Sequence, residues 1–155
     1  MSAARGASPR RRDAASSGSP TAQGLRARLG AFDGEPAAAI LRLADLPAST
    51  GAVLGEVETA ARAGGTAVRC LAHAASGVVR VAVARAEHVA PLVARLRPAA
   101  ERRGGTCVVH RAEPAAAADL DRWGDPGDGL ALMRGVKAAF DPDGIFAPGR
   151  FVGGL

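Results

Sequence analysis

Four side chains that can carry positive charge fall on alternating positions of predicted β-strands, where together they could bind an anion. Arginine holds a carboxylate through two parallel hydrogen bonds, and several cations together lower the cost of removing water from it. The alternative is that an open sheet face simply requires polar residues, and arginine is abundant in this composition. Neutral substitutions of two of the arginines would separate these interpretations. The four candidate anion-binding residues are Arg42, Arg69, Arg80 and His110.

Other candidate chemistry is sparse. Cys70 and Cys107 are predicted on the two edge strands of a four-stranded sheet, about 14 Å apart at a strand spacing of about 4.8 Å. A disulfide requires Cα atoms within about 7 Å, so we expect two reduced, buried thiols. His73, His88 and His110 have no metal-ligand spacing with the cysteines. We therefore predict no metal site, and no nucleophile with its base can be identified.

The elements that would position these residues come from a repeat. A Gly-Gly-Thr sequence at residues 64–66 recurs at residues 104–106, forty positions later. Each copy follows a helical pattern, where glycine caps a helix; a phosphate-binding loop would instead precede one. We interpret both glycine pairs as structural. The predicted elements are strand 38–44, helix 49–63, strand 66–73, strand 77–84, helix 86–102 and strand 106–111.

Two such βαβ units joined by a hairpin predict an α+β fold, the ferredoxin-like βαββαβ sandwich. Its sheet is antiparallel with strand order 4-1-3-2, and both helices lie on one face. Pro98 is expected to kink the second helix or end it early. One face of the strands is wholly apolar and should pack against the helices. It comprises Leu41, Leu43, Val68, Cys70, Val79, Val81, Val83, Cys107 and Val109.

The basic character of the chain belongs mainly to its N-terminal segment. Residues 1–34 contain six arginines against two aspartates, whereas the remainder nearly balances at 14 basic and 13 acidic side chains. Since this segment is rich in Ser, Ala, Gly and Pro, we expect residues 1–35 to form a disordered basic tail. No apolar run follows its arginines as in a signal peptide, and none approaches the ~20 residues of a membrane span. We predict a cytoplasmic protein without a membrane span.

The C-terminal segment combines a predicted helix at residues 129–140 with a sharp stop, a turn and a Pro-Gly-Arg tail. Asp141 and Pro142 end the helix, because proline disfavours helical geometry in the residue before it. Ile145, Phe146 and Phe151 are large apolar residues in a segment without periodicity. We expect them to pack against another surface.

The pattern K-x-x-F-D-P-x-G-I-F-x-P-G-R-F at residues 137–151 resembles the C-terminus of FAD-linked oxidases of the vanillyl-alcohol oxidase type. The likeness is greatest to the FAD-binding subunit of glycolate oxidase, strong over residues 123–155 and in pattern only back to residue 36. The family usually has Asn where this chain has Ala147. A Trp-Gly also precedes the last helix in the family, and we expect Trp123 to anchor that helix to the sandwich.

The resemblance implies that residues 36–113 form a cap domain whose sheet roofs the flavin and substrate, and that residues 114–155 form the C-terminal helix and tail. A cationic roof would suit a 2-hydroxy acid such as glycolate, bound by the four residues named above. Pro148, Gly149 and Arg150 would lie near the FAD. Residues 1–36 contain no strand–turn–helix unit for a pyrophosphate. The chain would then be a truncated gene product or one half of a split subunit. Its expected partners are an FAD-domain chain or other oxidase subunits, and we expect no FAD binding or glycolate oxidation by this chain alone.

A second hypothesis is a stand-alone ferredoxin-like module that binds a ligand or oligomerises without catalysis. It predicts a soluble oligomer with no dependence on flavin. RNA binding is disfavoured, because RNA-recognition folds of this topology stack bases on sheet aromatics and this face has none.

Overall fold

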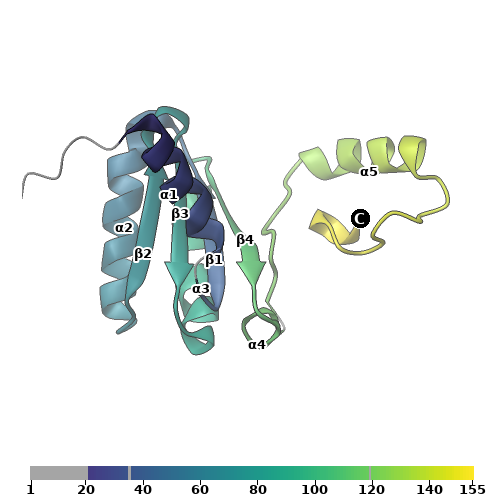
Figure 1. Cartoon of the computed structure of the whole chain (residues 1–155). Coiled ribbons are helices and arrows are strands. Elements are labelled where there is room, and N and C mark those ends of the chain that lie inside the picture. The colour runs from purple at the N-terminus through teal and green to yellow at the C-terminus, as the bar shows by residue number, and fades with distance from the viewer. Residues whose placement is uncertain (1–20, 35, 119) are drawn as a thin grey trace, which may run out of the picture.

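A computed structural model describes residues 21–34, 36–118 and 120–155, with a four-stranded sheet at its centre (Figure 1). The elements of the sandwich are β1 (Ala39–Ala44), α2 (Thr50–Ala63), β2 (Val68–His73), β3 (Val78–Val83), α3 (Val89–Glu101) and β4 (Thr106–Ala112). Neighbouring strands are antiparallel in the order β2-β3-β1-β4, and α2 and α3 cover one face. The predicted ferredoxin-like α+β fold is confirmed, with its strand order.

The glycine pairs end the two helices, as predicted. Gly65 and Gly104 adopt left-handed backbone geometry, with φ of +61° and +75°. Gly64 N–H donates to the Ala60 carbonyl at 3.0 Å, and Gly105 N–H donates to the Ala100 carbonyl at 3.0 Å. These bonds satisfy carbonyls that a helix end leaves without a partner, so the repeat serves helix capping.

The expectation that Pro98 would end α3 early is wrong. The helix continues through Pro98 to Glu101. Pro98 lacks the N–H that would bond to the carbonyl of Ala94, an exposed residue whose carbonyl water can reach. Leu96 and Ala100 are buried on either side and hold the last turn against the sheet. Packing therefore outweighs the proline penalty.

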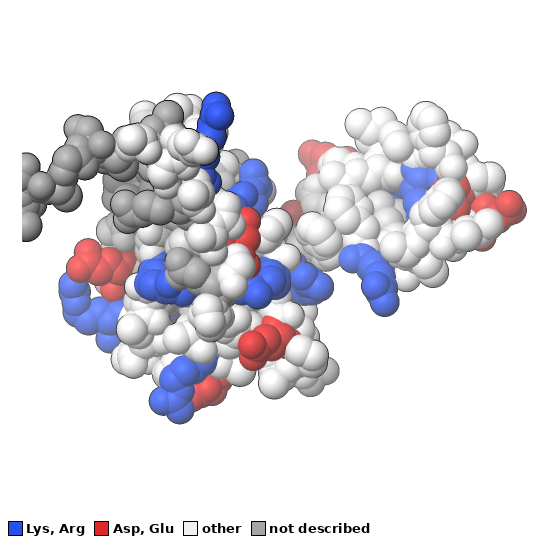
Figure 2. All heavy atoms as spheres, viewed as in Figure 1, with Lys and Arg blue, Asp and Glu red and all other residues white. Residues whose placement is uncertain are grey.

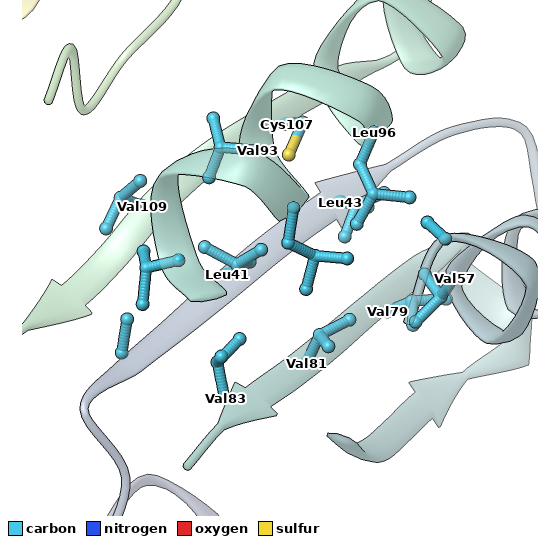
Figure 3. Packing of buried hydrophobic residues seen from close by; sticks show 14 of the residues in the cluster. Leu41, Leu43, Val57, Val79, Val81, Val83, Val93, Leu96, Cys107 and Val109 are labelled. Atoms are coloured by element: carbon cyan, nitrogen blue, oxygen red, sulfur yellow. The ribbon is translucent and has the colours of Figure 1, made fainter. Parts of the chain in front are cut away.

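The main core lies between the sheet and helices α2 and α3 (Figure 3). Val53 and Val57 come from α2, and Leu92, Val93 and Leu96 come from α3. Burial of a Val or Leu side chain contributes about 1.5–3 kcal/mol, so this layer is the main source of stability. From the predicted apolar face of the sheet the cluster takes Leu41, Leu43, Val79, Val81, Val83, Cys107 and Val109.

The prediction of two buried thiols is correct for Cys107 and wrong for Cys70. Both cysteines are free, but Cys70 is exposed. It lies on β2, an edge strand whose outer side has no neighbouring strand in the described part of the chain. Val68, on the same face of β2, is only half-buried for the same reason.

The predicted disordered tail is wrong for its last third, because Ala22–Gly34 forms helix α1. This helix lies over the sheet face opposite α2 and α3 (Figure 1). Phe32 is buried there against Ala37, Ile40 and Ala82, with Leu71 packed beside them. The Phe32 ring thus attaches α1 to the sheet. The sequence of this segment has no apolar periodicity that would have predicted the contact. Residues 1–20 lie outside the described residues.

The C-terminal part comprises the short α4 (Pro114–Ala117), α5 (Gly129–Phe140) and a tail that folds back along α5 (Figure 1). The helix has the predicted bounds. It contains no buried residue, although its apolar side chains recur on one stripe. No helix among the residues that the structure describes is long and apolar enough to cross a membrane.

Candidate functional site

Arg42 and Arg80 are the two predicted anion-binding residues that the structure brings together. They are direct cross-strand partners on β1 and β3. Asp33 of α1 pairs with one of them, its Oδ2 atom lying 2.5 Å from Arg80 Nη1. Two neighbouring guanidinium groups, those of Arg42 and Arg80, therefore lie beside the Asp33 carboxylate. Figure 2 looks onto this side of the sheet and shows basic side chains gathered below α1.

A groove of about 300 Å³ lies between α1 and this part of the sheet. The imidazole Nδ1 of His73 and the hydroxyl of Ser76 lie 2.7 Å apart at the β2–β3 hairpin and form a hydrogen bond. The groove thus combines two cations, a polar pair and apolar walls, which is a composition suited to a small anion. Its lining is Leu29, Arg42, Leu71, His73, Ser76, Val78 and Arg80.

Arg69 and His110 lie outside this groove. Arg69 stands opposite Ala82, toward the other end of β2, and its Nη2 donates to the Pro36 carbonyl at 3.5 Å. His110 falls at a β-bulge between two register positions of β1 and β4. The bulge places Arg111 opposite Ile40, so Arg111 joins the basic face that regular alternation assigned to His110. No sequence signal marks this bulge.

A second and larger groove, of about 780 Å³, lies between α5 and the tail. Its apolar lining is largely open to solvent: Phe140 is 82% exposed, Leu132 74% and Phe146 70%. Such a contiguous apolar surface is typical of an interaction site. Lys137, Asp141 and Arg150 supply the charged side chains of its wall.

The turn after α5 is fastened by two side chains of the C-terminal pattern. Asp141 is buried; its Oδ1 accepts from Ile145 N–H at 2.8 Å, and its Oδ2 from Phe146 N–H at 3.1 Å. Lys137 Nζ donates to Asp141 Oδ2 and, at 2.7 Å, to the Phe146 carbonyl. These hydrogen bonds, that of Lys137 first, hold the pKa of Asp141 below its ordinary value.

Trp123 anchors the tail, whereas it was expected to anchor α5 to the sandwich. Its indole N–H donates to the Arg150 carbonyl at 3.1 Å. Its ring meets Phe151 edge to face, with the centroids 4.8 Å apart. Pro148, Gly149 and Arg150 are therefore held at one end of the C-terminal groove, and Arg150 lines its wall.

Arg97 joins this anchor to the sandwich. Its Nε donates to the Cys107 carbonyl at 3.0 Å, its Nη1 to Asp121 Oδ2 at 3.0 Å, and its Nη2 to the Asp121 carbonyl at 2.8 Å. Asp121 Oδ1 in turn accepts from Trp123 N–H at 2.9 Å. One arginine thus links α3, β4 and the segment that carries Trp123.

The described residues do not form a cradle for FAD by themselves. Of the helices whose preceding residues are described, only α5 follows a glycine-rich turn, residues 124–129. That turn carries Asp125 and Asp128, whose carboxylates would repel a pyrophosphate. Gly149, with φ of +73°, and Arg150 offer a bare backbone and one cation on an exposed loop. These residues can contribute to a cofactor site but cannot enclose one.

Neither thiol is poised for nucleophilic chemistry. Burial raises the pKa of Cys107 to about 11, and it also raises the pKa of Cys70. Within the described ranges, no three His, Cys, Asp or Glu side chains gather where a metal ion could bind.

The fold and the two grooves define a ferredoxin-like sandwich with an appended helix and tail that exposes apolar surface. A family model described as FAD linked oxidases, C-terminal domain, matches residues 43–151. The match spans well over half of the chain, so this protein belongs to the family of FAD-linked oxidases and represents their C-terminal part. No curated protein and no solved structure matches the chain.

Proposed function

We propose that the chain is the cap and C-terminal portion of an FAD-dependent 2-hydroxy-acid oxidoreductase of the glycolate type, and that it works in the cytoplasm with an FAD-binding domain. Residues 36–113 would be the cap, and residues 114–155 the helix and tail that meet the flavin domain. The family supports FAD as the cofactor of the whole assembly. Arg42, Arg69, Arg80 and His110 would attract the anionic substrate.

The observation that carries this proposal is the exposed apolar groove between α5 and the tail. A 12-residue helix without any buried residue leaves its apolar face largely uncovered, whereas most helical stability comes from packing of that face. The groove lies largely within the span matched by the family. A flavin domain docked there would cover Leu132, Phe140 and Phe146 and would bring Pro148, Gly149 and Arg150 toward the cofactor.

The test uses the flavin-loaded FAD-binding domain of a glycolate oxidase subunit, cut before its own cap. Size-exclusion chromatography and quenching of Trp123 fluorescence by the flavin measure its association with this chain. We expect binding, and we expect glycolate but not neutral glycolamide to bleach the flavin absorbance. The chain alone, mixed with free FAD, should show no protein-bound flavin band.

Two aspartate substitutions separate docking from folding. Phe140→Asp and Phe146→Asp should abolish association while circular dichroism of the sandwich is unchanged. Leu46→Asp is the matched control, because Leu46 is 68% exposed on the sandwich. A stable oligomer that ignores the flavin domain, or association that survives both substitutions, would instead favour the stand-alone binding module.

A further inference from the structure

The groove under α1 contains a half-buried arginine that has no partner among the residues that the structure describes. Arg42 makes no hydrogen bond or ion pair with any residue that the structure describes. Its cross-strand neighbour Arg80 is paired with Asp33. Like charges directly opposite each other on a sheet are destabilising. The pair with its single carboxylate keeps one net positive charge, which one further anion would neutralise.

The carboxylate already present is imperfectly bound. Asp33 Oδ2 accepts from Arg80, but Asp33 Oδ1 is buried and has no hydrogen-bond partner in the described part of the chain. A buried acceptor left without a donor costs free energy, because its bond to water has been lost. Asp33 therefore satisfies only part of what the two arginines can donate.

We propose that this groove is a binding site for a small singly charged carboxylate, which Arg42 holds and which competes with Asp33 for the Arg42–Arg80 pair. The net single charge fits a monoanion better than a phosphate dianion. Both arginines carry planar forks that match the two oxygens of a carboxylate. Helix α1 then acts as a cover whose own side chain takes the ligand's place when the site is empty.

The remaining walls narrow the ligand class. The groove measures about 300 Å³, at the lower end of small-molecule sites, and Leu29, Leu71 and Val78 close its apolar side. The hydrogen-bonded pair of His73 and Ser76 supplies polar atoms that can bind a hydroxyl. A short 2-hydroxy carboxylate fits this arrangement, and the choice of glycolate as its example rests on the proposed function.

Helix α1 makes few contacts with the sheet, which a ligand that displaces Asp33 requires. Of the α1 side chains that the structure describes, Phe32 alone is buried. It packs against Ala37, Ile40 and Ala82, and Leu71, which lines the groove, packs beside this cluster. Among the α1 side chains that the structure describes, Phe32 supplies the buried contact and Asp33 the ion pair to the sheet. Loss of the Asp33 contact frees Arg80 without disturbing the main core between the sheet, α2 and α3.

The experiment is a titration of the full chain with glycolate, followed by amide chemical shifts in nuclear magnetic resonance, with neutral glycolamide as the isostere. We expect glycolate alone to shift the amides of β1, β3 and α1. Arg42→Gln should weaken binding at least roughly tenfold, since one charge-assisted pair is lost. Asp33→Asn should strengthen it roughly threefold to tenfold, because the competitor loses its charge. Arg95→Gln, an exposed arginine on α3, is the matched control and should change nothing.

If the Arg42→Gln variant does not fold, the glycolate affinity of the Asp33→Asn variant tests the proposal. Equal binding by the Arg42 and Arg95 variants, or weaker binding after Asp33→Asn, would overturn the proposal. The two proposals can fail separately, because docking to the flavin domain is tested at Phe140 and Phe146. Docking without glycolate binding refutes the carboxylate site only. Glycolate binding without docking refutes the oxidoreductase role and leaves a carboxylate-binding module.

Discussion

Lys137 and Asp141 are joined by an ion pair across one turn of α5, and both also bind the backbone of Phe146. The lysine donates to the Phe146 carbonyl while the aspartate accepts from its N–H. The pair therefore closes the turn around Pro142 and aims the tail back along the helix. It gives a physical reason for the lysine and aspartate of the C-terminal pattern.

The pair makes tail docking sensitive to acid. The pKa of Asp141 in the folded protein lies below its ordinary value of 3.8, so its ionised form is favoured by folding. A carboxyl group of this kind contributes its full stabilisation of the folded state at pH values above its pKa in the unfolded chain. The contribution is lost as the pH falls through its pKa in the folded protein. We expect the fluorescence of Trp123, the single tryptophan of the chain, to report a docked tail at neutral pH and its release below about pH 4.

Asp141→Asn should release the tail at neutral pH, because an amide cannot pair with Lys137 as a carboxylate does. Amide exchange at Ile145 and Phe146 should quicken by roughly tenfold or more as their acceptor weakens. Asp143→Asn is the control, since Asp143 is exposed in the same turn. Equal effects of the two substitutions would contradict the assigned role of Asp141.

Ala147 adopts a left-handed backbone conformation with φ of +46°. Residues with a β-carbon pay about 1–2 kcal/mol for this geometry, and asparagine tolerates it better than alanine. The family's usual Asn at this position therefore has a backbone explanation. Ala147→Asn should raise the stability of the docked tail by about 0.5–1 kcal/mol, measured by thermal release of Trp123.

Ala138→Asn is the opposite-signed control for that prediction. Ala138 is exposed within α5, where asparagine is less favourable than alanine by up to about 0.7 kcal/mol. A gain at both positions, or a loss at Ala147, would rule out relief of backbone strain as the cause.

The sandwich could be predicted from the sequence because its signals were redundant. The Gly-Gly-Thr repeat, the apolar alternation of Leu41 and Leu43, and the helical spacing of Val53 and Val57 all indicated the same topology. Packing of those side chains in one core then fixed the register. Local pattern and tertiary burial agree here, as expected of a foldable sequence.

The site was less predictable because single long-range contacts decide it. Helix α1 depends on the burial of Phe32 and on one ion pair between Asp33 and Arg80, 47 residues away. The bulge that exchanges His110 for Arg111 opposite β1 leaves no trace in residue types. The grouping of Arg42 with His73 follows from the hairpin closing beneath α1. None of these contacts produces a periodic pattern of residue types from which it could be predicted.

The two cysteines should differ in reactivity toward a soluble disulfide reagent. Cys70 is exposed and Cys107 buried, so one thiol should react in the folded protein and two after denaturation. Because the pKa of Cys70 is raised, its rate should be slow at neutral pH and rise about tenfold per pH unit. Cys70→Ser should remove the reactive thiol, and Cys107→Ser should not. Two reactive thiols in the native state would contradict this arrangement of the sheet.

The hairpin beside the groove under α1 depends on Gly77. Its φ is +66°, and a β-carbon added there would lie 1.9 Å from the carbonyl oxygen of Asp45. Asp45 N–H also donates to the Gly77 carbonyl at 3.1 Å, so the two backbones cannot separate freely. Gly77→Ala should therefore cost about 1–2 kcal/mol for left-handed geometry and a further ~1–3 kcal/mol for the clash.

Gly65→Ala separates these two contributions. Gly65 has a similar φ of +61°, but an added β-carbon would meet nothing within 4 Å. Urea unfolding should show a loss of about 1–2 kcal/mol for Gly65→Ala and a clearly larger loss for Gly77→Ala. Since His73 and Ser76 flank this turn, only Gly77→Ala should also weaken glycolate binding. Equal losses of stability in the two variants would mean that the close backbone approach at Asp45 does not exist in solution.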